Sequence, residues 1–212
     1  MTTKTSQASE KKAQILAAAG ALLAKRGLQH LSFENIAHEA GLSRQLVRYY
    51  YPEMDALIVD LCDLLGDEYR RILVSGIVEV GQVGRLGFFL DFFFNLADGR
   101  PMPENLQTYD AMVAYSVSSK ALRDRMNLHY RTLGQVVEHE LAISYPQLTG
   151  HACQELSFMF VSMMHAHWSF VASLGYSPEH SRLARSAMER LIRSYVETPP
   201  EGPVIAVPWQ RT

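Results

Sequence analysis

The sequence has little cysteine, and this scarcity excludes a disulfide-stapled fold. Cys62 and Cys153 are the two cysteines among 212 residues, whereas secreted disulfide-rich folds of modest size are dense in cysteine. The first twelve residues are polar and contain no apolar run, so we expect no secretory signal and a cytoplasmic location. We expect both cysteines to be small buried residues rather than redox sensors.

Motifs that carry catalytic or metal chemistry are also absent. The histidines follow no His-Glu-x-x-His pattern, and no Cys-His cluster occurs. His165 and His167 are two residues apart, so on a helix they point to different faces. We therefore expect no catalytic site, no metal and no cofactor, and we expect the histidines to be core or interface residues with hydrogen-bond partners; the protein is not predicted to be an enzyme.

Long uncharged runs are lacking, with one exception. Residues 156–178 contain no Asp, Glu, Lys or Arg, and this length could formally span a bilayer. Histidines and serines interrupt the run, however, and no basic cluster flanks it. A buried helix at an oligomer interface explains the run better, and a membrane span stays open as the alternative.

Charge is scarce overall but unevenly distributed. The formal net charge is −2, yet residues 1–52 hold seven Lys and Arg against three acids, a net of +4. The remaining 160 residues hold 13 bases and 19 acids, a net of −6. This split favours a basic N-terminal module that binds a polyanion and is attached to an acidic body.

Alternating apolar and polar residues are not sustained anywhere, so no strands are predicted. Apolar residues instead recur at helical spacing between the prolines. The sequence predicts an all-α fold of about nine helices, at residues 10–26, 33–40, 44–50, 54–76, 84–98, 104–116, 120–144, 150–174 and 178–197. We expect Gly27 to end the first helix as a left-handed cap, and the proline-rich residues 199–212 to form an irregular tail.

Residues 32–51 carry the pattern of a helix-turn-helix. Two short helices each follow a serine suited to N-capping, Ser32 and Ser43, and Gly41 supplies the positive φ of the turn between them. The helix at 10–26 is needed as a third wall, because such short helices are unstable alone. The buried face is predicted to consist of Phe33, Ile36, Ala37, Ala40, Leu42, Val47 and Tyr51.

The second helix of this pair leaves polar side chains exposed that suit a DNA major groove. Arg pairs bidentately with guanine, Gln with adenine, and Tyr bonds a phosphate oxygen. A solvated helix face would look similar in isolation, but the caps, the glycine turn and the local +4 charge favour DNA binding. The predicted DNA contacts are Ser32, Ser43, Arg44, Gln45, Arg48, Tyr49, Lys11 and Lys12.

The run Ser32…Ile36-Ala37…Ala40-Gly41-Leu42-Ser43…Tyr50-Tyr51-Pro52…Ala56-Leu57 resembles the DNA-binding signature of TetR-family transcriptional regulators, over about residues 10–60. The resemblance implies a helix-turn-helix domain at residues 1–53 and a helical ligand-binding and dimerisation domain at 54–198. The sequence departs from the family at two positions. Arg48 stands where the family usually has Tyr, and Met54 where it usually has a phosphate-contacting Lys. Glu53 and Asp55 beside Met54 either weaken DNA binding further or simply cap the next helix.

The body is rich in aromatic residues. The helix containing Phe88, Phe89, Phe92, Phe93 and Phe94 is apolar on nearly every side and must be buried all round. Plain core and pocket lining are both open for these residues. The candidate ligand-binding residues are Phe88, Phe92, Tyr109, Met112, His129 and Trp168. The pattern around Trp168 faintly resembles the choline- and betaine-responsive branch of the family, although an aromatic cavity suits any apolar effector equally.

The last two long helices have more apolar surface than a monomer can bury. Met159, Phe170 and Leu174 belong to the first of them, and Leu183 and Leu191 to the second. Two such helices and their copies would form a four-helix bundle across a two-fold axis, as the family resemblance implies. A homodimer presents two recognition helices and so predicts a near-palindromic operator.

The resulting hypothesis is a one-component regulator, most simply a repressor that a small molecule releases from its operator. An activator or a ligand-independent DNA binder with the same fold is the first alternative. An all-α small-molecule-binding protein, in which the helix-turn-helix has no DNA role, is the second.

Overall fold

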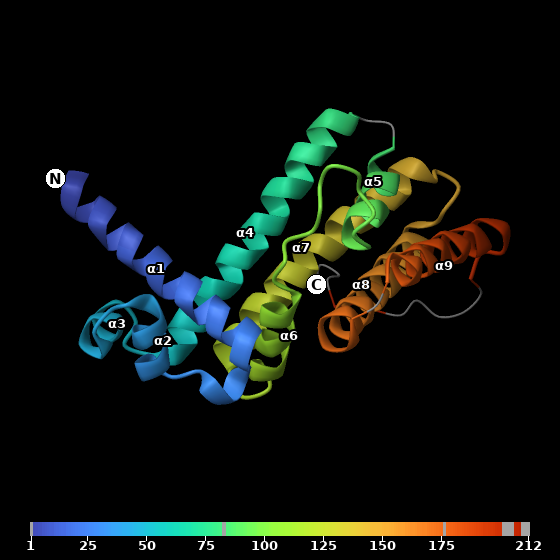
Figure 1. Ribbon diagram of the computed structural model, residues 1–212. Helices are drawn as coiled ribbons and strands as arrows, with labels where there is room; N and C mark the ends of the chain where they lie inside the picture. The colour runs from blue at the N-terminus through green and yellow to red at the C-terminus, as the bar shows by residue number, and fades with distance from the viewer. Residues whose placement is uncertain (1, 82–83, 176, 201–205, 209–212) are drawn as a thin grey trace. The chain divides into compact units, whose positions relative to one another are not determined.

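The computed structural model describes residues 2–81, 84–175, 177–200 and 206–208, and within them the side chains of all but 2–6 and 172. All regular structure in these residues is helical (Figure 1). The helices are α1 (Thr2–Arg26), η1 (Leu28–His30, a 3₁₀ turn), α2 (Phe33–Ala40), α3 (Arg44–Tyr50), α4 (Met54–Val80), α5 (Arg85–Phe93), α6 (Leu106–Tyr115), α7 (Lys120–Ser144), α8 (Gly150–Leu174) and α9 (Pro178–Glu197). The all-α prediction is confirmed, and most of the predicted tail lies outside the described residues.

The chain forms two compact units. The head unit comprises Met1–Asp67 and Glu104–Met126, and the body unit comprises Glu68–Pro103 and Asn127–Thr212. Helices α4 and α7 therefore contribute residues to both units. These two units are defined by compactness alone, and they do not coincide with the expected domains at residues 1–53 and 54–198. The expected domains were defined by function and stay a prediction.

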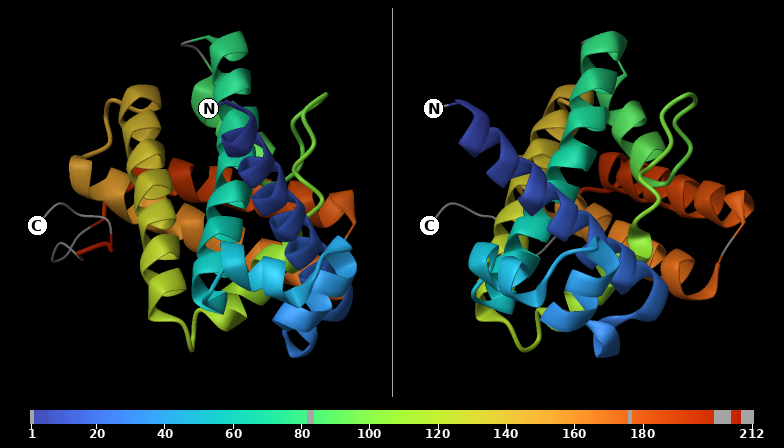
Figure 2. Two further views of the ribbon diagram at one scale, coloured as in Figure 1. Left: turned by 90° about the vertical axis from the view of Figure 1, so that its left-hand side faces the viewer. Right: turned by 60° about the vertical axis from the view of Figure 1, so that its left-hand side comes forward.

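In the head unit, α2 packs on α1, α3 packs on α2, and α6 also lies against α1 (Figures 1 and 2). The core consists of fully buried aliphatic side chains from each of these helices, with α4 and α7 completing it. Burial of each such side chain contributes about 1.5–3 kcal/mol, which is how helices of two turns become stable here. The residues are Ile15, Ala19, Leu22, Ile36, Val47, Leu57, Ile58, Leu61, Met112 and Leu122.

The body unit is built around the aromatic helix α5. Phe89, Phe92 and Phe94 are completely buried, and the indole N–H of Trp168 on α8 donates to the carbonyl oxygen of Phe93 at 2.7 Å. Helices α8 and α9 pack side by side. The prediction that α5 is buried nearly all round is thus confirmed, except that Phe88 is only half-buried.

Four predicted helices have a wrong boundary at one or both ends. Helix α1 begins eight residues before the expected residue 10, because its polar start contains no proline or glycine to end a helix. Helix α4 continues past Gly76, where the absent Cβ leaves room for the Phe88 ring. Helix α6 is shorter than the expected 104–116.

Helix α5 ends at Phe93, five residues before the prediction. Asn95 adopts a left-handed φ of 55°, a conformation that Asn tolerates better than most residues. The Leu96 N–H then donates to the Asp91 carbonyl at 2.7 Å and closes the helix end. The Asn95 side-chain oxygen accepts the N–H of Met102 at 3.0 Å, which fixes this turn.

Candidate nucleic-acid interface

The turn between α2 and α3 is fixed by local hydrogen bonds. The Ser32 hydroxyl oxygen accepts the backbone N–H of Asn35, and the Ser43 hydroxyl oxygen accepts that of Leu46, both at 3.1 Å. Gly41 has a left-handed conformation, with φ 63° and ψ 33°. These three features are as the sequence predicted, and they set the direction of α3 relative to α2.

Gly27, the predicted end of the preceding helix, departs from expectation. Its φ of 72° is positive, but its ψ of −177° is extended, so it is not the left-handed cap that was predicted. The chain turns there into η1, where Asn35 of α2 donates its side-chain amide to the carbonyl oxygen of His30 at 2.8 Å. The positive φ still requires glycine at this position.

Helix α1 holds the helix pair from behind. The side-chain amide of Gln14 donates to the carbonyl oxygen of Ala40, the last residue of α2, at 2.7 Å. Lys25 forms an ion pair with Glu39 at 3.6 Å. The end of α2 is therefore anchored directly to the middle of α1.

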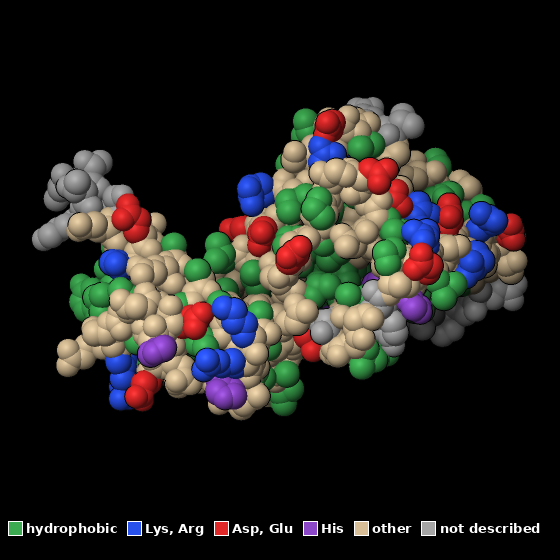
Figure 3. Space-filling model, in the orientation of Figure 1, with side chains coloured by type: hydrophobic (Ala, Val, Ile, Leu, Met, Phe, Trp, Pro, Cys, Tyr) green, Lys and Arg blue, Asp and Glu red, His purple; other side chains and the backbone are tan. Residues whose placement is uncertain are grey.

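Helix α3 presents four polar side chains to solvent around its single buried residue. Val47 is completely buried, while Arg44, Gln45 and Arg48 are exposed and Tyr49 is 77% exposed. Lys, Arg and His side chains lie on the surface of the N-terminal helices, with acidic side chains among them (Figure 3). The exposure predicted for this face of α3 is confirmed, and two predicted core positions, Phe33 and Leu42, are instead half-buried.

The half-buried ring of Phe33 supports an arginine. The Arg48 guanidinium lies over this ring, 5.5 Å from its centroid. A cation over an aromatic face is attracted by the ring quadrupole, so the contact holds Arg48 at the exposed surface of α3. No sequence pattern signals the contact, because the two residues lie on different helices.

The two lysines predicted as DNA contacts differ in their surroundings. Lys11 donates to the side-chain oxygen of Gln14 at 3.0 Å. Because Gln14 is neutral, this contact does not compensate the positive charge of Lys11. Lys12 lies 3.7 Å from the Asp60 carboxylate and over the ring of Tyr51, 5.0 Å from its centroid. Lys12 thus joins α1 to α4 as well as carrying charge.

The N-terminal segment also matches a known family in sequence. Residues 15–61 match the profile described as bacterial regulatory proteins, tetR family. This match covers α1 from its first buried residue, the helix pair and the first two turns of α4. The N-terminal helices are therefore of the tetR-family type in sequence.

Solved structures share the TetR fold over nearly the whole chain. A TetR transcription regulator from Haloarcula marismortui is 19% identical, with TM-score 0.71, over 88% of this chain and 98% of its own. A proposed transcriptional regulator from Saccharomonospora viridis in complex with choline is 18% identical, with TM-score 0.71, over 90% and 97%. NalD of Pseudomonas aeruginosa, the secondary repressor of the MexAB-OprM multidrug efflux pump, is 16% identical, with TM-score 0.65, over 87% and 96%. No curated protein sequence matches the chain.

At the start of α4, the sequence differs from the usual TetR-family pattern. Met54 is half-buried and begins α4. The Asp55 carboxylate accepts hydrogen bonds from the hydroxyls of Tyr115 and Ser119, both at 2.8 Å. These hydrogen bonds are a third role for Asp55, beside the weakened DNA binding and the capping of α4 that the sequence suggested. Its partners lie 60 and 64 residues away, so no local sequence signal identifies them.

The candidate ligand-binding residues fall into both units. Tyr109 and Met112 belong to α6 of the head unit, where Met112 is completely buried. In the body unit, the rings of Phe88 and Phe92 stack at 6.1 Å, and Tyr69 connects Phe92 at 6.4 Å to Trp168 at 5.3 Å. His129 is half-buried. An open depression in the body unit, about 590 Å³, is lined by none of the candidates; its lining is Asn95, Leu96, Ala97, Asp98, Gly99, Pro101 and Arg182.

Two further histidines, on α8, form hydrogen bonds with side chains of other helices. His165 pairs with the Tyr130 hydroxyl at 2.9 Å, and His167 with Ser181 at 3.2 Å. Burial, and then the positive charge of His180, lower the pKa of His167. His139 is exposed in the single chain, so the core position is wrong for it and the interface position stays a prediction. Among the described residues, no group of three or more His, Cys, Asp or Glu could hold a metal ion.

Both cysteines are buried, as predicted. Cys62 is 3% exposed and Cys153 is 1% exposed. Burial, and to a lesser extent the charge of Asp63, raises the pKa of the Cys62 thiol to about 12, whereas a reactive cysteine requires a lowered pKa. Within the part of the chain that the structure describes, no helix is long and apolar enough to cross a membrane, residues 156–175 included.

Proposed function

We propose that the protein is a ligand-responsive transcriptional repressor that binds a near-palindromic operator as a homodimer. The observation that carries the proposal is the arrangement of α3 in a TetR-family module. Val47 is buried on a helix that packs against α2, while Arg44, Gln45, Arg48 and Tyr49 are exposed. These side-chain types recognise base edges and phosphates.

Within this surface we assign different roles to neighbouring residues. Arg44, Gln45 and Tyr49 read bases or position the helix over them. Arg48, whose guanidinium lies over the Phe33 ring, contacts a backbone phosphate. The hydroxyls of Ser32 and Ser43 accept backbone N–H groups with their oxygens and retain their own protons for phosphate oxygens. Lys11 adds charge at the edge of the surface, and Lys12 adds less because Asp60 compensates it.

The homodimer is supported by the two apolar faces of α8. One face is buried within the body unit, and the other leaves Phe170 54% exposed and Leu174 65% exposed. On α9, Leu183 is 61% exposed. An exposed apolar surface of this kind is typical of an interface between protomers, and a dimer would carry two recognition helices to successive faces of a duplex.

The effector is proposed to bind in the body unit, with Phe88, Phe92, His129 and Trp168 as candidate contacts. Tyr109 and Met112 belong to the head unit and are not part of this proposed site. A choline complex of one structural neighbour and the efflux-pump role of another support a small organic effector in general terms. To act as a switch, the effector must bind the DNA-incompetent conformation more tightly, by a few kcal/mol.

The experiment is a selection of bound duplexes from a random library with the purified protein, followed by footprinting on the selected sequence. The proposal expects one enriched motif and two protected half-sites centred roughly 34–36 Å apart or a multiple of this. Candidate effectors, with choline first, are then titrated against the complex. Failure to enrich any motif contradicts DNA recognition, whereas an effector that tightens the complex contradicts release by ligand.

A further inference from the structure

The first turn of α4 is held by two hydroxyl groups from a distant part of the head unit. The Tyr115 hydroxyl donates to Oδ1 of Asp55, and the Ser119 hydroxyl donates to Oδ2, each at 2.8 Å. Burial, and then the hydrogen bond and charge of Asp55, raise the pKa of Tyr115 to about 12. Each carboxylate oxygen thus has a neutral donor directed at it, a strong arrangement for an ionised acceptor.

Ser119 performs two structural tasks at once. It is 1% exposed, and besides donating to Asp55 its Oγ accepts the backbone N–H of Leu122 at 3.2 Å. The second bond satisfies an otherwise unpaired amide at the beginning of α7. The start of α7 and the start of α4 are therefore joined through a single buried side chain.

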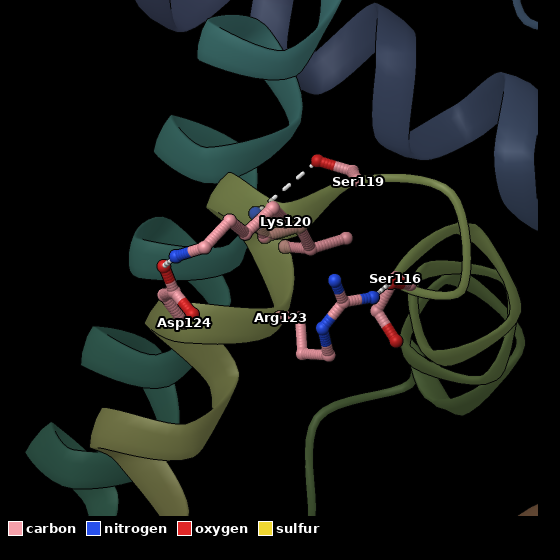
Figure 4. A network of polar contacts seen from close by, with 6 residues as sticks. Ser116, Ser119, Lys120, Arg123 and Asp124 are labelled. Carbon is pink, nitrogen blue, oxygen red and sulfur yellow. Dashed lines mark hydrogen bonds and ion pairs between the residues drawn. The ribbon is translucent and has the colours of Figure 1, made fainter.

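The segment between α6 and α7, residues 116–119, is itself braced. Arg123 donates from Nη1 to the carbonyl oxygens of Ser116 at 2.8 Å and Val117 at 3.3 Å. Figure 4 shows the contact with Ser116 and, within α7, the pair of Lys120 and Asp124 at 2.5 Å. We call residues 115–119 the α6–α7 corner. At the other end of α6, the Thr108 hydroxyl donates to the carbonyl oxygen of Gly20 on α1 at 3.1 Å.

The recognition helix is connected to α4 over a very short distance. Three residues separate the end of α3 at Tyr50 from the start of α4 at Met54. The first of them, Tyr51, is 2% exposed, and its hydroxyl donates to Asp60 of α4 at 2.9 Å. The direction of α3 therefore follows the first two turns of α4.

We propose that Asp55, with Tyr115 and Ser119, positions the recognition helix, so that the α6–α7 corner sets the angle at which α3 meets DNA. The inference rests on the proposed DNA-binding function and deepens it. Asp55 touches no DNA in this account; it acts through α4 and α3. Loosening the corner lets α4 turn at its N-terminus and carries α3 with it.

The test uses the full-length protein and the selected operator, with half-sites moved apart in single-base-pair steps. Tyr115→Phe and Ser119→Ala each remove one hydroxyl, and we expect each to weaken operator binding about five- to tenfold. The double variant is expected also to bind altered spacings nearly as well as the natural one, while base preference within a half-site is retained. Asp55→Asn, which keeps one acceptor, is expected to lose less than Asp55→Ala.

Ser118→Ala is the matched control. Its hydroxyl donates to the Tyr115 carbonyl within the same corner and does not touch Asp55, so wild-type affinity and spacing preference are expected. A variant that is only destabilised would contain less active protein but would keep the wild-type spacing preference. All affinities are therefore calculated from the concentration of active protein, which a stoichiometric titration measures. Unchanged spacing preference in the double variant overturns the proposal.

A second readout does not depend on DNA. Amide hydrogen exchange of residues 44–58 is expected to accelerate in the double variant and to stay unchanged in Ser118→Ala. If the wild-type protein selects no duplex, the proposed function fails, and hydrogen exchange alone decides the positioning role: faster exchange supports it, and unchanged exchange overturns it.

Discussion

The guanidinium of Arg48 on α3 lies over the ring of Phe33, the first residue of α2, 5.5 Å from the ring centroid. This contact crosses the turn of the helix-turn-helix and joins an exposed cation to a half-buried ring. It gives Arg48 a preferred position before any DNA is present, which reduces the entropy lost when the side chain binds a phosphate.

Replacing Phe33 by Leu should weaken DNA binding uniformly. The variant keeps an apolar side chain of similar burial but lacks the ring face, so a contact of about 0.5–1 kcal/mol is lost and affinity falls roughly two- to fivefold. Fluorescence anisotropy on the operator and on an unrelated duplex measures the change. Phe33→Tyr retains the ring and should bind as the wild type does. A loss confined to the operator would mean that Phe33 serves base recognition instead.

Replacing Arg44 by Ala should relax sequence preference. A good bidentate contact to guanine contributes about 1–3 kcal/mol of discrimination, so one position of each half-site should become degenerate in a repeated selection. Arg48→Gln is the comparison variant, since loss of a phosphate contact should lower affinity for every duplex and leave the selected motif intact. The assignment of Arg44 to a base is wrong if its variant selects the wild-type motif at full strength.

Stability should fall at high pH partly through Tyr115. Its pKa is raised to about 12 by burial and by Asp55, above the value of about 10 expected in the unfolded chain. The folded state therefore holds this proton more tightly, and its contribution is fully present below about pH 10 and lost as the pH rises towards 12. Urea unfolding of the wild type and of Tyr115→Phe between pH 9 and pH 11.5 measures the difference. The free energy of unfolding of the variant should fall less across this range, because the variant lacks one tyrosine whose pKa is raised in the folded state. An equal fall with pH in both proteins would contradict the prediction.

The exposed apolar face of α8 and α9 should hold two protomers together. Phe170→Glu and Leu183→Glu each place a charge in the proposed interface, and each should weaken dimerisation by at least tenfold. Sedimentation or light scattering across a dilution series measures the dimer. Val78→Glu, at a residue 76% exposed on α4, is the matched control and should dimerise normally. A wild-type chain that is monomeric throughout the series would contradict the interface.

The sequence predicts the local parts of this molecule well. The bounds of α2 and α3 are as predicted to the residue, because Ser32, Ser43 and Gly41 define them by contacts within a few positions. The exposure of the polar face of α3 follows from the same short-range pattern. The family resemblance proposed on these residues agrees with the tetR profile over residues 15–61.

Contacts between distant segments are the parts that could not be predicted. The end of α5 depends on Asn95 accepting the N–H of Met102, and the placement of Asp55 depends on Tyr115 and Ser119. Apolar periodicity shows that a residue is buried but not which helix buries it. For the same reason, six large or aromatic residues chosen as pocket lining are distributed over both units.

The salt dependence of operator binding tests the central claim most directly, because an exposed basic recognition helix must displace counterions from the duplex. The account predicts that the logarithm of the association constant falls linearly with the logarithm of salt concentration, with a slope of roughly −0.9 for each phosphate contacted. Arg48→Gln should reduce the steepness by about one such contact. An association constant that is independent of salt, or a slope that Arg48→Gln leaves unchanged, would contradict the account.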